Sequence, residues 1–155
     1  MDLRERYSRT VCDCEACCAL CEACPGMLVP GDWDRIAEYT GEDLTGWLLA
    51  SPGALVAKLI GQRVATFRVP TIVPEVVDGN CRFRFSDGLC SIHEVAPFGC
   101  SHFDTHMDAT EGGERSRAAL LAIWASEVYQ GRWQLLWDAG RRSAPPEVKR
   151  EALRR

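Results

Sequence analysis

The chain has 155 residues, 46% of them hydrophobic, so it can bury a core, and we expect one domain. Its formal net charge is −4 at pH 7, and no basic run precedes the C-terminal tail, so nucleic-acid binding has no electrostatic support. The N-terminal segment is charged, and no apolar run approaches the roughly 20 residues of a membrane helix. We therefore expect a cytoplasmic protein that does not act at a membrane.

Cysteine is concentrated near the N-terminus, where six of the nine cysteines lie between Cys12 and Cys24. Thiolates bind zinc, iron–sulfur clusters and copper(I), whereas cysteines that serve as small apolar residues are usually scattered. In a reducing compartment, clustered thiols indicate metal ligands rather than disulfides. Reduced core cysteines and disulfides are the alternatives.

The spacing of Cys14, Cys17, Cys21 and Cys24 allows these four sulfurs to converge. On a helix, positions i, i+3, i+7 and i+10 share one face. In a loop, the same residues would form two Cys-x-x-Cys knuckles.

Two helices are expected after this segment. The first has Asp32 as its N-cap and ends at Gly41, with Ile36 and Tyr39 facing inward. Residues 42–50 are predicted to form the second, from their apolar spacing.

Extended structure is expected next. Residues 54–60 fit either a helix or a strand, and residues 63–69 alternate well enough for a strand. Pro70 and Pro74 limit the following segment to an edge strand or an extended loop.

A short β-hairpin is predicted around Asp87-Gly88, a strong turn sequence. A two-residue loop there would pair Phe85 with Cys90 and point Cys81 and Cys90 the same way, about 13 Å apart along the ladder. One small metal centre could then bind both cysteines only if the hairpin bends or frays at Cys81.

The clearest helix runs from Glu114 to about Asp138 and ends before Gly140, with Gly131 interrupting it. Its apolar stripe is expected to face the core and contains Leu121, Trp124, Val128 and Trp137. The predicted fold is α+β, a small, mainly helical domain over residues 1–140 with a cysteine-rich metal-binding lobe and a short β-hairpin. Residues 141–155 are expected to form a linker and a short C-terminal helix.

The cysteine pattern resembles the bacterial CxxCxxCC cysteine-cluster proteins, also called YkgJ-like and described as a zinc- or iron-chelating domain. Cys14 and Cys17-Cys18 match the N-terminal motif, and Cys81 resembles the lone cysteine that precedes a short strand. The closing block C-x-I-Y-E-x-R-P-x-x-C-R-x-F is matched by Cys90, Ile92, Glu94, Pro97, Cys100 and Phe103. The resemblance covers residues 12 to 103 and implies metal chelation, without a known reaction.

This chain also departs from the family pattern. His93, Ala96 and Ser101 stand where the family has tyrosine, arginine and arginine, and Cys12 lies one residue closer than the family's first cysteine. The positive charges that the family has at two of these positions are therefore missing in this chain. Additional cysteines beyond the family motif suggest an enlarged metal site.

Adjacent Cys17 and Cys18 diverge on either a helix or a strand, so they suit two neighbouring metal sites better than one ion. One partition gives a first site to Cys14, Cys17, Cys21 and Cys24, and a second to Cys18, Cys81, Cys90 and Cys100. A single cubane with spare thiols is also possible. We favour an iron–sulfur cluster of the 4Fe-4S type over zinc, although both accept all-cysteine ligand sets.

The histidines are weaker candidates. His102 and His106 lie at i, i+4, but a polar loop is the favoured interpretation, and His102 is the first to test because it is near Cys100. His93 is expected to be packed or to support a ligand.

The sequence thus predicts a cytoplasmic metal-binding protein with an electron-transfer or enzyme-supporting role and a redox or enzyme protein as partner. A zinc-stabilised interaction module and a small metalloenzyme with an open metal position are the alternatives. No Ser-His-Asp signature, P-loop or dinucleotide motif identifies a reaction.

Overall fold

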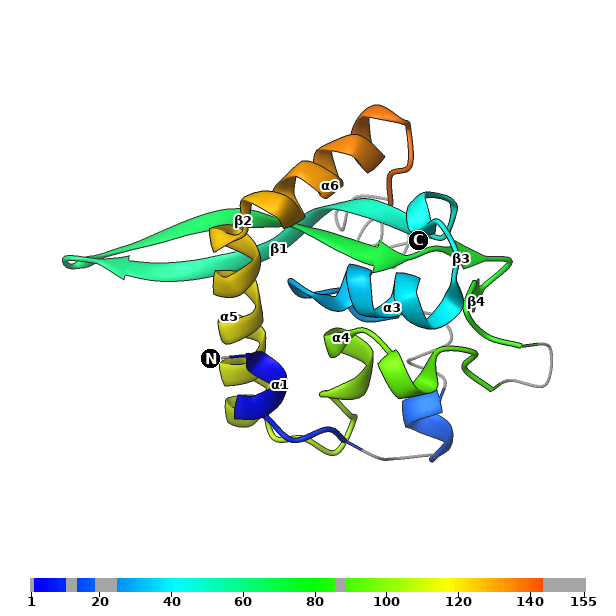
Figure 1. The fold of residues 1–155 in the computed structure, drawn as a ribbon. Helices are drawn as coiled ribbons and strands as arrows, with labels where there is room; N and C mark the ends of the chain where they lie inside the picture. The colour runs from blue at the N-terminus through cyan, green and yellow to red at the C-terminus, as the bar shows by residue number, and fades with distance from the viewer. Residues whose placement is uncertain (1, 11–13, 19–24, 86–88, 144–155) are drawn as a thin grey trace, which may run out of the picture.

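The structure is a computed structural model that describes residues 2–10, 14–18, 25–85 and 89–143. Helices pack around a long antiparallel hairpin, and a second pair of very short strands lies beside it (Figure 1). The predicted α+β class is confirmed. Among the described residues, no helix has the length and apolar character needed to span a membrane.

The N-terminal part contains α1 (Leu3–Arg6), a helical turn over residues 15–18, and α3 (Asp32–Thr40). Helix α3 ends at Gly41, which adopts a left-handed φ of 71° as a C-cap, as predicted. Ile36 is fully buried as expected, but Tyr39 is 49% exposed, so its predicted inward orientation is wrong.

The second predicted helix, over residues 42–50, is wrong. A 3-10 turn η1 (Leu44–Gly46) is the helical part of this segment, and strand β1 (Leu48–Ile60) begins two residues later. Leu44, Leu48 and Ala50 are all fully buried. Their burial comes from the turn and the first part of the strand, where residues at spacing two share a face.

Strand β1 pairs antiparallel with β2 (Arg63–Pro74) from Leu48↔Pro74 to Ile60↔Arg63. The strand prediction for residues 63–69 is confirmed, and residues 54–60 are strand rather than helix. The pair has no third full strand among the described residues, so both prolines of β2 lie on an edge, as proline requires.

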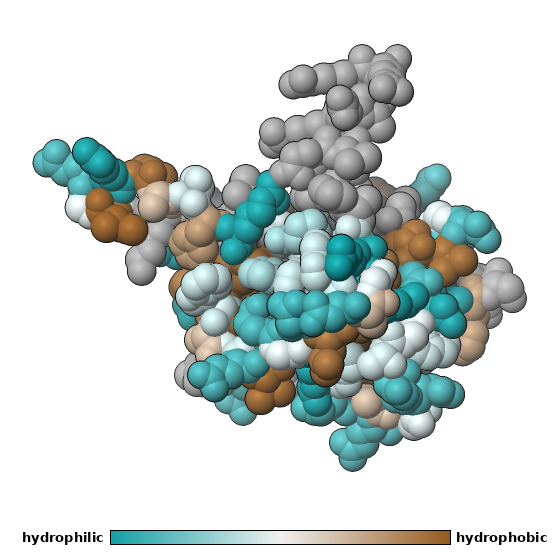
Figure 2. All heavy atoms as spheres, turned by 90° about the horizontal axis from the view of Figure 1, so that it is seen from above, coloured by the Kyte–Doolittle hydropathy of each residue, from teal (hydrophilic) through white to brown (hydrophobic). Residues whose placement is uncertain are grey.

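The hairpin is buried at its base and projects from the body at its tip (Figure 1). Val69 and Ile72 are 1% exposed, whereas Ile60 and Val64 are 61% and 67% exposed. The space-filling view shows apolar side chains on this projection (Figure 2).

The predicted short hairpin forms with a different register. Strands β3 (Val76–Val77) and β4 (Asn80–Cys81) pair with each other, and Arg84, rather than Phe85, lies opposite Cys90. A shift of one residue reverses the face on which a side chain lies. The turn at residues 86–88 lies outside the described residues.

After the 3-10 turn η2 (His93–Val95) and α4 (Phe98–Ser101), the predicted long helix is divided into α5 (Ala109–Ala125) and α6 (Glu127–Asp138). The break is at Ser126, whose hydroxyl caps α6 by accepting the Tyr129 N–H at 3.2 Å, and not at Gly131.

The stripe predicted on this helix is wrong for three of its members, because α5 buries the face that contains Ala119, Leu120 and Ile123. Leu121, Trp124 and Val128 are 45%, 57% and 67% exposed. The buried apolar positions are Ala119, Leu120, Ile123, Tyr129 and Leu136.

The chain after α6 pairs with β1, because the Ala50 N–H donates to the Arg141 carbonyl and the Ser143 N–H donates to the Ala50 carbonyl, at 2.8 and 2.9 Å. Contacts with the domain therefore continue through Ser143. The helix predicted near the C-terminus lies outside the described residues.

Candidate metal centre

Cys14, Cys17 and His106 bring three potential metal-ligating atoms within 4.8 Å of one another. The Cys14 Sγ lies 3.3 Å from the His106 Nε2, although the two residues are 92 positions apart. No further group of three such residues meets the same distance in the part of the chain that the structure describes.

The two sulfurs come from one turn of helix over residues 15–18, with Cys14 directly before the turn and Cys17 within it. The Cys18 N–H donates to the Cys14 carbonyl at 3.0 Å, which closes the turn and puts positions i and i+3 on one side. The Cys17 N–H also points at the Cys14 Sγ, 3.5 Å away. This contact orients the Cys14 sulfur on the side of the turn where the Cys17 side chain also lies.

His106 comes from the loop between α4 and α5. The Asp104 carboxylate accepts the His106 N–H at 2.9 Å and fixes this turn. The neighbouring Thr105 N–H donates to the Cys17 Sγ at 3.4 Å, and the Thr105 hydroxyl lies 3.1 Å from the same sulfur. The loop therefore supplies one ligand and also supports a second.

Backbone contacts place the N-terminal chain beside this loop. The Thr10 N–H donates to the Ser101 carbonyl at 2.8 Å. Arg115 is buried and donates to the carbonyls of Ser8 and His102, at 2.7 and 3.0 Å. Contacts within the protein, without a metal ion, thus place the N-terminal chain next to the loop that carries His106.

The other predicted ligands lie at several places around this region. The Cys18 carbonyl accepts from the Arg84 guanidinium at 3.1 Å, and the Cys100 Sγ accepts the Gly26 N–H at 3.0 Å. Cys81 is buried and Cys90 is half-buried on the short hairpin. No disulfide joins any two of the six described cysteines to each other.

Cys12, Cys21 and Cys24 lie outside the described residues. The proposed division of eight cysteines between two sites therefore stays a prediction. The described residues give a different grouping, in which Cys14 and Cys17 are joined by a histidine.

The two remaining histidines do not contribute to this group. His102 is 2% exposed, stacks on Phe98 with ring centroids 4.4 Å apart, and has its Nδ1 2.7 Å from the Ser101 hydroxyl. Burial, assisted by nearby arginines, lowers the pKa of His102 to about 4. His93 is exposed, so its expected packing is wrong, and its alternative role of supporting a ligand stays a prediction.

The sequence interpretation preferred His102 to His106, and the structure reverses that order. Proximity to Cys100 along the chain was the reason for choosing His102. The informative signal was Asp104, two residues before His106, because this spacing is typical of a side-chain-capped turn that presents the next residues on a loop.

The donor set fits one small ion. In a tetrahedral zinc site, bonds of about 2.3 Å to sulfur and 2.0–2.1 Å to nitrogen place neighbouring ligand atoms about 3.6–3.8 Å apart. The ligands of a cubane bind different iron atoms and therefore lie farther apart. The close sulfur–nitrogen approach at Cys14 and His106 resembles the first case.

Comparisons of the chain with protein-family models, curated proteins and solved structures give no match. The resemblance to the CxxCxxCC proteins is therefore carried by the spacing of the cysteines, and the chemistry of the site is argued from its own residues.

Proposed function

We propose that this protein binds a single metal ion, with zinc as the preferred occupant, through Cys14, Cys17 and His106. The observation that carries the proposal is the convergence of three donor atoms within 4.8 Å from two segments far apart in the sequence. Two thiolates and an imidazole are a ligand combination that zinc accepts, and imidazole is uncommon as a ligand of iron–sulfur clusters.

The role that we propose for the ion is to fasten the N-terminal cysteine segment to the loop before α5. Three protein ligands leave a fourth tetrahedral position. A cysteine such as Cys21 or Cys24 in that position would make the site structural, as in an interaction module. Water or a substrate in that position would make the site catalytic, as in a small metalloenzyme.

An iron–sulfur cluster in a cytoplasmic protein that transfers electrons or supports a partner enzyme is the second candidate. The density of cysteines from Cys12 to Cys24 favours it. The contacts from Arg84 to Cys18 and from Gly26 to Cys100 favour it too, because they place the short hairpin and α4 next to that segment. Such a cluster would need a different set of ligands from the three that converge in the described residues.

The test is metal and sulfide analysis of protein purified and kept without oxygen. We expect about one zinc ion per chain and a colourless protein, whereas a cluster would give brown protein with broad absorption near roughly 400 nm and acid-labile sulfide. Replacement of the zinc by cobalt(II) would add thiolate-to-metal absorption that reports the ligands directly.

Substitutions then identify the ligands. Cys17→Ser and His106→Ala should each lower bound zinc severalfold, while His93→Ala, at an exposed histidine outside the group, should keep it. Unchanged metal in both ligand variants would contradict the proposed site. Loss of iron and sulfide in Cys100→Ser would instead support the cluster.

A further inference from the structure

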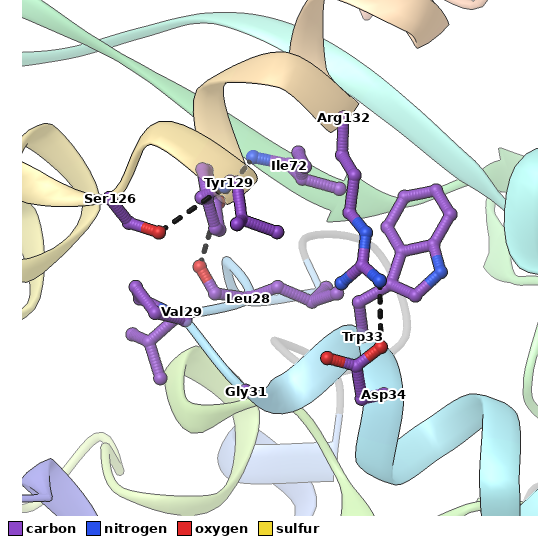
Figure 3. A pocket seen from close by; sticks show the side chains of 11 residues that line it. Leu28, Val29, Gly31, Trp33, Asp34, Ile72, Ser126, Tyr129 and Arg132 are labelled. Carbon is purple, nitrogen blue, oxygen red and sulfur yellow. Dashed lines mark hydrogen bonds and ion pairs between the residues drawn. The ribbon is translucent and has the colours of Figure 1, made fainter.

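A pocket outside the metal centre lies where the first turns of α3 and α6 meet β2 at Ile72 (Figure 3). Its volume is about 250 Å³. A dry cavity of roughly 150 Å³ can hold benzene, so this pocket has room for one ring with a substituent. None of its lining residues belongs to the Cys14–Cys17–His106 group.

One side of the pocket is apolar and rigid. Leu28, Val29 and Ile72 line it and are at most 3% exposed. The Tyr129 hydroxyl donates to the Leu28 carbonyl at 2.8 Å and accepts the Ile72 N–H at 2.7 Å. Both hydrogen bonds of this hydroxyl are therefore made to the backbone. The hydroxyl holds Leu28 and Ile72 together in the wall of the pocket and does not offer a polar contact to a ligand.

Arg132 supplies a cation on the other side. Its guanidinium lies over the Trp33 ring, 5.1 Å from the centroid, and its Nη2 is 2.7 Å from the Asp34 carboxylate. Figure 3 shows the guanidinium between Leu28 and Trp33, with one terminal nitrogen directed at Asp34 and the other on the opposite side. Within the described residues, its Nε and Nη1 donate to no protein acceptor.

The balance of charge favours a negative ligand. The side chain of Asp34 is 68% exposed, so water screens its charge, whereas the Arg132 side chain is 28% exposed. Arg132 holds the pKa of Asp34 below its ordinary value, chiefly through the hydrogen bond that it donates to this carboxylate. The N-terminal ends of α3 and α6 add partial positive charge to the same pocket.

We propose that this pocket binds a small carboxylate with an apolar, ring-sized body. The carboxylate pairs with the donors of Arg132 that Asp34 does not use. The body contacts Pro30 and Val128, the exposed apolar residues of the lining, above the buried layer of Leu28, Val29 and Ile72. The Ser126 hydroxyl, which accepts the Tyr129 N–H, keeps its proton for a polar substituent at the far end. This site is separate from metal binding and does not depend on it.

Benzoate is the probe that tests this proposal, with benzamide as its neutral counterpart of nearly equal shape. Each is titrated into the full-length protein, and binding is followed at the indole N–H resonance of Trp33, assigned with Trp33→Phe. We expect saturable shifts with benzoate and an affinity at least about tenfold higher than for benzamide, because a hydrogen-bonded ion pair is worth more than a neutral contact.

Arg132→Gln should weaken benzoate binding about tenfold and leave benzamide binding nearly unchanged. The matched control is Arg142→Gln, because Arg142 also lies over a tryptophan, 4.3 Å from the Trp137 centroid, but lines no part of this pocket. This control should bind benzoate like the wild type.

Equal affinity of the wild-type protein for benzoate and benzamide would overturn the carboxylate assignment. This comparison tests the proposal even if Arg132→Gln does not fold. Equal losses in Arg132→Gln and Arg142→Gln would show non-specific attraction and also overturn it. Inorganic phosphate shifting Trp33 as strongly as benzoate would refute the role of the apolar wall. No shift of Trp33 with benzoate up to about 20 mM would refute the site itself.

Discussion

The buried carboxylate of Asp32 offers a direct test of how the N-terminal elements are held together. Asp32 is 1% exposed, and its Oδ2 accepts the N–H groups of Val29 and Phe98 at 3.0 and 2.8 Å. Its Oδ1 pairs with the guanidinium of Arg4 at 2.8 Å, and that of Arg35 lies 3.6 Å away. One side chain thus connects α1, α3 and the start of α4.

Asp32→Ala should lower the free energy of unfolding by about 4 kcal/mol. Two buried N–H donors would lose their acceptor, at about 1–3 kcal/mol each, and removing one partner of a buried ion pair costs about 3–5 kcal/mol. These contributions overlap, and Arg4 is 16% exposed and can regain some hydration, so we take a value within their range rather than their sum. Asp32→Asn keeps an acceptor but no charge and should lose about 2 kcal/mol.

The assay is urea unfolding followed by tryptophan fluorescence and circular dichroism. The urea midpoints of the variants are compared, provided that the dependence of the unfolding free energy on urea concentration is unchanged. Asp34→Ala is the matched control, because this carboxylate pairs with Arg132 near the surface and should contribute at most about 1 kcal/mol. A loss of less than about 1 kcal/mol in Asp32→Ala would show that the buried network does not stabilise the fold as argued.

Four further outcomes are expected. Gly26→Ala should destabilise the protein by about 3 kcal/mol in urea unfolding, because its Cβ would lie 2.0 Å from the Gly99 carbonyl carbon. Tyr129→Phe should cost about 2 kcal/mol in the same assay, since it leaves the Leu28 carbonyl without its buried donor. Because the pKa of His102 is lowered to about 4, the free energy of unfolding is highest above pH 6.5 and falls by about 3 kcal/mol as the pH is lowered to about 4. The free energy of unfolding of His102→Gln, measured over the same pH range, should lack this decrease. Metal removal by a chelator should lower the thermal midpoint by less than about 5 °C, measured by calorimetry, while amide exchange accelerates in residues 14–18 and 104–107.

Local patterns that depend on a few neighbouring residues were predictable from the sequence. Gly41 ends α3 because glycine accepts a left-handed φ, and this requirement is visible without tertiary contacts. Alternation over residues 63–69 gave the strand for the same reason. By contrast, residues 42–50 have apolar positions that fit a helix, and the structure instead divides them between a turn and a strand that bury the same leucines.

The errors in the later elements come from the choice of the buried helix face and from a register shift of one residue. Helix α5 buries Ala119, Leu120 and Ile123, so the stripe drawn through Leu121 and Trp124 lies on its exposed face, and Ser126 then ends this helix and caps the next. In the short hairpin, pairing Cys90 with Arg84 instead of Phe85 alters which face the cysteine shares. Neither the helix break nor the register has a strong signal in a single sequence.

Two of the three candidate ligands, Cys14 and Cys17, could be predicted from the sequence, whereas His106 could not. The spacing of Cys14 and Cys17 identified them as a pair, since i and i+3 share a side in a helical turn. His106 reaches them through the fold, as the loop before α5 is placed by contacts of Thr10 and Arg115 with residues 101–103. Such long-range packing is not encoded in ligand spacing.

The position of this site indicates that the ion stabilises the attachment of residues 14–18 to the His106 loop and is not required for the rest of the fold. Cys14 and Cys17 are half-buried and His106 is exposed, whereas the core contains residues from Leu28 to Leu136 and includes none of these three. The loop that presents His106 is also held by protein contacts, through Arg115 and the capped turn at Asp104. A metal ion stabilises only those conformations in which its ligands are close enough to bind it. Its binding free energy should therefore mainly stabilise the turn over residues 14–18 against local unfolding. The apolar core, which buries its residues independently of that turn, should persist when the ion is removed.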